Sequence, residues 1–227
     1  MTDIFYNKLT EYGMGGAADA MAAYADKLLA VNEHMNLTRI TDEAEVAVKH
    51  FADSAHPDIG ARIGENASVI DIGTGGGFPG VPLKLMRQDI AISFMESAAK
   101  KLNFVKQTCE ELGIEGSFYN ERAEEAADKR EKYDVAVSRA VASLPILLEL
   151  CSPFVKVGGR VLAYKGQIAE QELLLAQNAI KKLNLELESS VAVTIEGASH
   201  VILVFKKTAK TPKQYPRRYA QINTYTL

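Results

Sequence analysis

The spacing of apolar residues in the first 65 positions predicts helices. Apolar side chains recur at i, i+3, i+4, i+7 and i+8, on one face of an amphipathic helix: Met21, Tyr24, Ala25, Leu28 and Leu29. A second helix is expected from Asp42 to about Ser54, because Asp42-x-x-Glu45 resembles a capping box. We therefore expect residues 1–65 to form an N-terminal helical extension.

After Ala67, short β-branched runs alternate with helical patterns. Strands are expected at 69–72, 91–96, 117–119, 134–138 and 160–164, and helices at 79–88, 98–112, 144–155 and 168–183. This alternation is typical of a Rossmann-like α/β domain with a parallel sheet, here over 66–206. Two last strands, near 185–195 and 199–206, are joined only by Glu196-Gly197-Ala198, which predicts an antiparallel hairpin at the sheet edge.

Composition narrows the possible location and chemistry. The hydrophobic fraction of 47% and the charged fraction of 24% predict a packed core. The opening residues contain acids and no long apolar run, and no 18-residue apolar stretch follows, so we expect a cytoplasmic protein without a membrane partner. The two cysteines and four histidines lack the spacing of metal ligands, and we expect no metal.

The charge is distributed unevenly along the chain. Of the 26 Lys and Arg residues, six lie between Gly197 and Leu227, where there is no acid, and the other 20 accompany all 29 acids. Residues 207–227 thus form a basic C-terminal tail, either a nucleic-acid contact or a solvated segment. The candidate RNA contacts are Lys165, Lys206, Lys207, Lys210, Lys213, Arg217 and Arg218, with stacking from Phe205, Tyr215, Tyr219 and Tyr225.

The stretch SVIDIGTGGGFPGVPLK, residues 68–84, is a glycine-rich turn between a strand and a helix. Such a turn lets the backbone approach a ligand closely. It cannot be a P-loop, because it ends Phe78-Pro79-Gly80-Val81 and lacks Gly-Lys-Ser/Thr. Gly75-x-Gly77-x-x-Gly80 matches the dinucleotide pattern, yet Asp71 precedes the glycines, and an acid repels a pyrophosphate and attracts a cation.

The spacing Asp71-x-Gly73-x-Gly75-x-Gly77 is that of the S-adenosylmethionine loop in Rossmann-like, class I methyltransferases. That cofactor carries a cationic sulfonium and an ammonium group. Glu96 ends the second strand, where a carboxylate can accept hydrogen bonds from both ribose hydroxyls. These residues predict an S-adenosylmethionine site; a nicotinamide oxidoreductase that uses the dinucleotide pattern is the alternative.

Most of the chain resembles the ribosomal RNA small-subunit methyltransferase G family, also called glucose-inhibited division protein B. The resemblance includes LLAVNEHMNLTRIT (28–41), KHFADS (49–54), the glycine stretch, SRAVASL (138–144), YKG (164–166) and TPKQYPR (211–217). It implies an enzyme that transfers a methyl group from S-adenosylmethionine to nitrogen 7 of one guanine in small-subunit (16S) rRNA. It also implies that Gly73 and Phe78 line the cofactor site, with Ala123 and Glu124 beside the adenine and Arg139 at the mouth.

The sequence departs from the family after Pro216, where Arg-Arg-Tyr-Ala-Gln-Ile-Asn replaces the common Arg-Lys-x-Gly-x-Pro, and at Val31, where tryptophan is common. Arg139 is the candidate catalytic residue, positioning the RNA substrate by holding a phosphate or the guanine; the alternative is an ion pair with Glu124 or Glu96 that shapes the pocket.

The implied chemistry needs few catalytic groups. Guanine nitrogen 7 has a lone pair and no proton, so its methylation is an in-line displacement without a general base. Cys109 lies on the apolar stripe of a helix, which predicts an inert buried thiol. His50, Asp53 and Ser54 fall within one helical turn, unlike a hydrolase triad, and are interpreted as a packed helix end. A ribosome-binding factor that holds S-adenosylmethionine without turnover is the third functional hypothesis.

Overall fold

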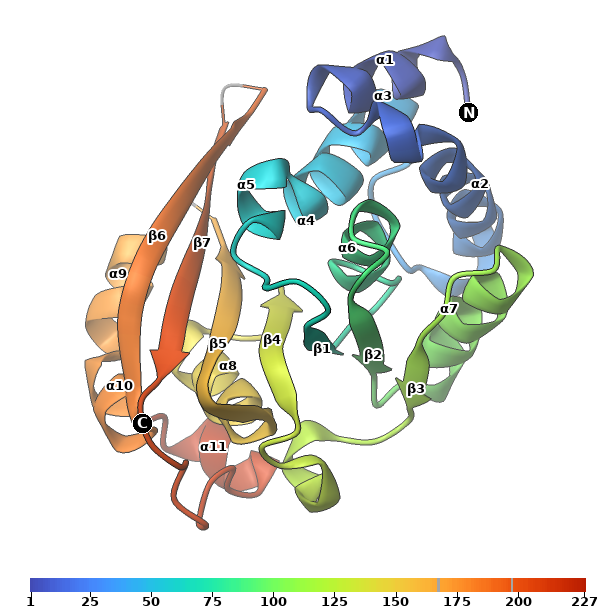
Figure 1. The fold of residues 1–227 in the computed structure, drawn as a ribbon. Helices are drawn as coiled ribbons and strands as arrows, with labels where there is room; N and C mark the ends of the chain where they lie inside the picture. Colours follow the sequence, from blue (N-terminus) through green and yellow to red (C-terminus); the bar gives the residue numbers. More distant parts are fainter. Residues whose placement is uncertain (167, 197) are drawn as a thin grey trace.

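The computed structural model describes residues 1–166, 168–196 and 198–227. A seven-stranded sheet runs through the molecule (Figure 1): β1 (Ser68–Ile72), β2 (Ala91–Met95), β3 (Ser117–Tyr119), β4 (Tyr133–Arg139), β5 (Val155–Lys165), β6 (Leu185–Ile195) and β7 (Ala198–Lys207). Its order is β3-β2-β1-β4-β5-β7-β6, with β1 to β5 parallel and β7 antiparallel to β5 and β6. The predicted α/β fold and edge hairpin are confirmed, although Gly197 of the predicted connection lies outside the described residues.

Helices cover the two faces of the sheet as separate layers, because side chains alternate along each strand. In β1, Val69 packs into one core and Ile70 and Ile72 into the other. The Val69 side is covered by α1 (Asp3–Glu11), α2 (Ala18–Met35), α3 (Glu43–Glu45), η2 (Val46–Ala52), α4 (Asp53–Ala55), α5 (Pro57–Gly60), α6 (Gly80–Met86) and α7 (Ala99–Glu111). The first 60 residues therefore share a hydrophobic core with the sheet.

The other face carries α8 (Leu144–Cys151), α9 (Ala169–Leu175) and α10 (Gln177–Lys182). The single helix expected over 168–183 is in fact two, because the Ala176 N–H bonds both Glu172 and Leu173 carbonyls and tightens the end of α9. The helix expected to reach 155 ends at Cys151, before a 3₁₀ turn containing Pro153, and β5 begins earlier than expected.

The second predicted helix is present but contains a π-helical segment. Residues 43–55 are helical throughout, and the Asp42 carboxylate accepts a hydrogen bond from the Glu45 N–H at 3.0 Å. The middle of this run is η2, a π-helical segment of a kind often found at functional sites. It carries Lys49 and His50 to the carboxyl ends of the strands, where both line a cavity.

Strand order reverses between β1 and β4, which is where open α/β sheets bind ligands. From β1 the chain continues through α6 to β2 on one side, and from β4 through α8 to β5 on the other. The carboxyl ends of β1 and β4 therefore diverge and leave a crevice between the glycine turn and Arg139.

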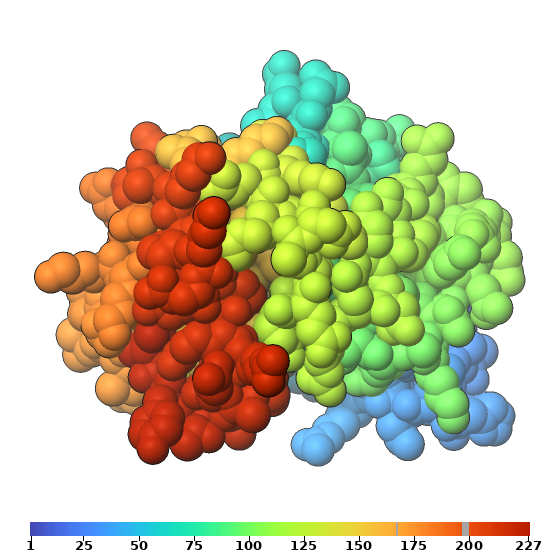
Figure 2. Space-filling model, turned by 90° about the horizontal axis from the view of Figure 1, so that it is seen from below, coloured from blue at the N-terminus to red at the C-terminus, as the bar shows by residue number. Residues whose placement is uncertain are grey.

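The C-terminal segment packs against the protein. The guanidinium and backbone N–H of Arg217 donate to Glu149 of α8 at 2.6–2.9 Å, and that carboxylate is 1% exposed. Arg130 donates to the carbonyls of Thr211 and Tyr215, and a short helix that was not predicted, α11 (Tyr219–Thr224), buries Ile222. In Figure 2 this segment, in red, lies against the yellow-green part of the chain.

We predict that Arg217→Ala lowers the free energy of unfolding by roughly 3 kcal/mol, because it leaves the buried Glu149 carboxylate without its partner. The neighbouring Arg218 is exposed, and Arg218→Ala is the matched control, expected within about 0.5 kcal/mol of the parent protein. Urea denaturation monitored by circular dichroism measures both. Equal stabilities for the two variants would show that the pair does not anchor the segment.

Candidate functional site

The glycine turn joins β1 to α6 in a conformation that side chains would prevent. Gly73, Gly75 and Gly77 all have positive φ angles. At Gly77 (φ +95°) a Cβ would also lie 2.2 Å from the hydroxyl oxygen of Tyr24, which donates to the carbonyl of Gly76. Gly77 is therefore required for packing the turn against α2, and it does not line the cavity described below.

Asp71 holds the turn from beneath. Its Oδ2 accepts hydrogen bonds from the Thr74 hydroxyl at 2.7 Å and the Gly80 N–H at 2.9 Å, and the residue is fully buried. Burial raises the pKa of Asp71 to about 7. Asp71 was expected to face the cofactor directly, but it lies outside the cavity lining, because its carboxylate is used to bridge the two ends of the turn.

Glu96 holds the turn from the side and also faces the cavity. Its Oε2 accepts a hydrogen bond from the Gly75 N–H at 3.1 Å, and its Oε1 accepts one from the Ala98 N–H at 2.9 Å. Each carboxylate oxygen has two acceptor positions, so both can accept a further hydrogen bond. Glu96 is thus positioned as the sequence predicts, at the end of β2 and beside the glycines.

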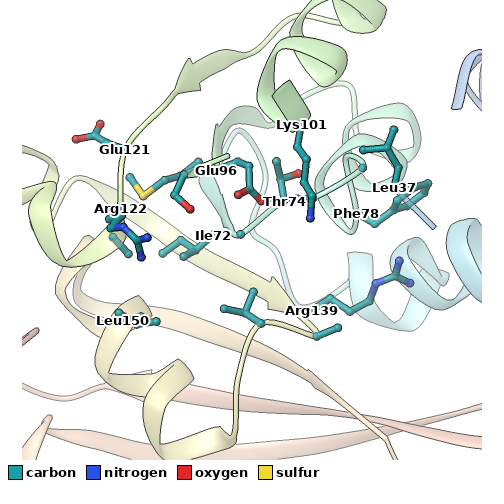
Figure 3. Close-up of a pocket in the computed structure, with 18 of the residues that line it drawn as sticks. Leu37, Ile72, Thr74, Phe78, Glu96, Lys101, Glu121, Arg122, Arg139 and Leu150 are labelled. Atoms are coloured by element: carbon teal, nitrogen blue, oxygen red, sulfur yellow. Dashed lines mark hydrogen bonds between the residues drawn. The ribbon is translucent and has the colours of Figure 1, made fainter. Parts of the chain in front are cut away.

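A cavity of about 440 Å³, which we call the loop cavity, lies above the turn. In Figure 3 one end holds Ile72, Arg122 and Leu150, and the opposite end holds Leu37, Phe78 and Arg139, with Thr74 and Glu96 between them. Of the predicted cofactor residues, the cavity is lined by Gly73, Gly75, Phe78, Glu96, Ala123, Glu124 and Arg139. Its volume is in the range of small-molecule sites.

Arg139 ends β4 and links the cavity to the N-terminal helices. Its guanidinium donates to the Lys49 carbonyl and to Asp53 Oδ2, both at 2.9 Å, and lies 5.3 Å from the centre of the Phe78 ring. The expected alternative partners were Glu124 or Glu96, but the ion pair is with Asp53. The pair fixes the orientation of Arg139 and leaves its side chain 16% exposed.

His50 and Asp53 line the site, although their sequence pattern indicated only packing. The His50 ring stacks on Phe78 with centroids 4.8 Å apart, and burial together with Arg139 lowers the pKa of His50 to about 4, so it is neutral near pH 7. Ser54 donates to a backbone carbonyl and takes part in no triad. Their place at the site follows from contact with Arg139, which lies 86 residues beyond Asp53 in the sequence, so a local pattern could not predict it.

A second cavity, the adjoining cavity, measures about 660 Å³ and shares His50, Arg139, Ala140 and Val141 with the loop cavity. Asp53 lies in its wall and is 8% exposed; its second oxygen contacts His200 Nδ1 of β7 at 2.9 Å. Lys165 lines it from β5 and pairs with Glu172 at 2.8 Å. Three elements that are distant in sequence therefore meet beside Arg139.

The predicted RNA contacts occupy different surroundings. Lys207 is unavailable to RNA, because its ammonium group is 0% exposed and donates to the carbonyls of Ser152 and Val155. Lys206 of β7 lies opposite Arg160 of β5 in the sheet. Arg160 precedes Lys165 by five positions, so Lys206 is away from the sheet edge where β5 ends. Arg217 is held by Glu149, while the exposed members are Lys206, Lys210, Lys213 and Arg218.

The described part of the chain also bears on membrane spans, metal sites and reactive cysteines. Within the described ranges, no helix combines the length and hydropathy of a membrane span, and no group of three His, Cys, Asp or Glu residues is arranged as a metal site. Cys109 and Cys151 are buried, and burial raises the pKa of both thiols, that of Cys109 to about 12.

Known proteins resemble this chain over nearly its whole length. A family model described as rRNA small subunit methyltransferase G matches residues 17–202. A protein named ribosomal RNA small subunit methyltransferase G from Lactobacillus delbrueckii subsp. bulgaricus is 42% identical over 90% of this chain and 89% of its own. A protein of the same name from Halalkalibacterium halodurans is 40% identical over 98% of both chains.

Solved structures resemble the fold at low sequence identity. The Bacillus subtilis M1A22 tRNA methyltransferase TrmK aligns with a TM-score of 0.54 and 15% identity, covering 68% of this chain and 65% of its own. The M. jannaschii protein TYW2, in complex with AdoMet, aligns with a TM-score of 0.51 and 15% identity, covering 66% and 75%. These likenesses support the class I methyltransferase fold.

The raised pKa of Asp71 generates a prediction about stability and pH. Between about pH 4 and 7 the folded protein retains a proton on Asp71 that the unfolded chain has released, so this contribution to stability decreases as pH rises and is constant above pH 7. Asp71→Asn removes the contribution. Relative to the parent protein, its free energy of unfolding should rise by up to about 1.4 kcal/mol per pH unit across that window. Urea denaturation from pH 4 to 8 measures the difference, and a pH-independent difference would contradict the assignment.

Proposed function

We infer the activity of this chain from its family: it belongs to the rRNA small subunit methyltransferase G family. The chain is an S-adenosylmethionine-dependent methyltransferase of small-subunit ribosomal RNA. We propose in addition that the methyl group goes to nitrogen 7 of a guanine and that the enzyme acts in the cytoplasm. Family membership across nearly the whole chain is the observation that carries the activity, and the site geometry supports the choice of nitrogen 7.

The loop cavity fits S-adenosylmethionine. Backbone, without side chains, forms its floor at Gly73, Gly75 and Gly76, and a Cβ on Gly73 would lie 2.4 Å from Val141 on the facing wall. The Glu96 carboxylate would accept hydrogen bonds from the ribose hydroxyls. Apolar side chains would surround the purine at the end that holds Ile72, Met95, Ala123 and Leu150. Bound there, the cofactor supplies an electrophilic methyl group.

The same turn is poorly suited to the pyrophosphate of a nicotinamide cofactor, because most of its amides are already bonded within the protein. The Gly75 N–H donates to Glu96, and the Gly80 N–H, at the start of α6, donates to Asp71. Backbone carbonyls accept from the N–H groups of Gly73, Thr74, Gly77, Phe78 and Val81. A pyrophosphate would meet the Glu96 carboxylate at this turn, with few free N–H donors, which favours a cationic ligand.

The adjoining cavity is the proposed site of the acceptor guanine. It meets the loop cavity at Arg139, so a base that enters it can present one edge to the cofactor. The three cations in its wall, Lys49, Lys165 and Arg139, outnumber the two carboxylates there, Asp53 and Glu172, and the net positive charge favours the RNA backbone. The neutral His50 and the stacked Phe78 form the boundary between the cavities, and their rigid packing would align the acceptor with the methyl donor.

The residues near the boundary suit attack by a nitrogen lone pair. Guanine nitrogen 7 has no proton to remove, so positioning is the main requirement. Methylation of a cytosine carbon needs a cysteine nucleophile, and both cysteines are buried thiols with raised pKa values. The third hypothesis from the sequence, a ribosome-binding factor without turnover, would hold S-adenosylmethionine in the same cavity, so a turnover assay is what separates it from the enzyme.

We predict that the protein transfers label from S-adenosylmethionine to small ribosomal subunits that lack the modification, and that nuclease digestion releases 7-methylguanosine. Mass spectrometry of the nucleosides identifies the product. Label on another nucleoside would refute the choice of nitrogen 7. Binding of the cofactor without any transfer would favour the ribosome-binding factor without turnover.

Two variants separate the proposed roles of the cavities. Glu96→Ala should weaken binding of S-adenosylmethionine at least about tenfold, because it removes a charged acceptor, whereas the exposed Glu110→Ala should not. Arg139→Ala should lower kcat roughly 10²-fold with a smaller effect on cofactor affinity, because it misplaces the acceptor. Arg160→Ala, in the middle of β5 and outside the lining of both cavities, is its control. An Arg139→Ala variant with normal turnover would remove Arg139 from the mechanism.

A further inference from the structure

Tyr219 of the C-terminal segment lies in the wall of the loop cavity. It was expected to stack on RNA, as one of several aromatic residues among the basic ones. Its ring instead lies 5.9 Å from the guanidinium carbon of Arg122, which lines the same cavity. Tyr219 is 43% exposed, so a ligand in the cavity could cover a substantial part of the ring.

The position of Tyr219 is fixed by contacts on both sides of it. Two residues earlier, Arg217 is bonded to the buried carboxylate of Glu149 on α8 and to the carbonyl of Tyr225. Three residues later, Ile222 is fully buried. The segment is thus tied down at each end, and the short helix α11 presents Tyr219 to the cavity from a supported backbone.

Tyr219 belongs to the end of the cavity that is remote from Arg139. Arg122, its contact, is grouped in Figure 3 with Ile72 and Leu150, while Arg139 and Phe78 lie at the opposite end. The adjoining cavity opens at the Arg139 end, so methyl transfer takes place there under the proposed function. The Tyr219 end is then the end that receives the purine of the cofactor.

We propose that Tyr219 is a cofactor-binding residue, whose ring forms part of the surface on which the purine of S-adenosylmethionine packs. The inference rests on the proposed function, because that function identifies the ligand of the loop cavity as S-adenosylmethionine. An aromatic ring beside a purine contributes stacking that its removal would abolish. The C-terminal segment therefore completes the cofactor site, and Arg217 acts as a positioning residue through its anchor on Glu149.

The test is calorimetric titration of the full-length protein with S-adenosylhomocysteine, which binds without turnover. Tyr219→Ala should raise its Kd about 5- to 50-fold, and Tyr219→Phe should stay within about twofold of the parent protein, because the ring is retained. Tyr225→Ala is the matched control, since Tyr225 lies in the same segment, is 75% exposed and is absent from the cavity lining. Methylthioadenosine, which retains the purine, should lose the same factor as S-adenosylhomocysteine.

Unchanged affinity of Tyr219→Ala, in a preparation where the parent protein binds, would overturn the inference and leave the proposed function intact. A parent protein that binds no S-adenosylhomocysteine would instead overturn the proposed function. The chain contains no tryptophan, so Tyr219→Trp introduces a single reporter at the cavity. Its fluorescence should change saturably with S-adenosylhomocysteine, and a signal that does not respond would count against the contact.

Discussion

The site depends on one constraint: the glycine turn is held by two carboxyl groups, that of the buried Asp71 and that of the half-buried Glu96. Asp71 bridges Thr74 and Gly80 from beneath, and Glu96 fixes Gly75 from the side. Together they hold the turn at the ends of β1 and β2, where its glycines line the loop cavity. They also use the amides that would otherwise attract phosphate, and so select against a dinucleotide while leaving acceptors for ribose.

Around this turn, the fold divides the chemistry between two neighbouring cavities. The divergence of the chain after β1 and β4 opens the crevice, and Arg139 stands where the cavities meet. Its partner Asp53 also contacts His200, so an N-terminal helix, a central strand and the edge hairpin all contribute to one boundary. The first 60 residues and the terminal hairpin thereby form part of the site as well as the core.

The sequence predicted what depends on local pattern: the strands, the glycine turn, and the positions of Glu96 and Arg139 at strand ends. It could not predict which charges would meet across the fold. Asp53 and Arg139 are 86 residues apart, and Glu149 and Arg217 are 68 apart. Local composition made Arg217 and Lys207 look like RNA contacts, whereas tertiary packing ties one to Glu149 and buries the other. The position of Tyr219 in the cavity wall depends on the pair of Glu149 and Arg217.

A crystal structure of the complex with S-adenosylhomocysteine would test the central claim most directly, because that claim concerns the orientation of the cofactor. We expect the ribose hydroxyls within hydrogen-bonding distance of the Glu96 carboxylate, the purine at the end that holds Arg122 and Tyr219, and the sulfur toward Arg139. A purine found beside Arg139, or a ligand bound outside the loop cavity, would contradict the account.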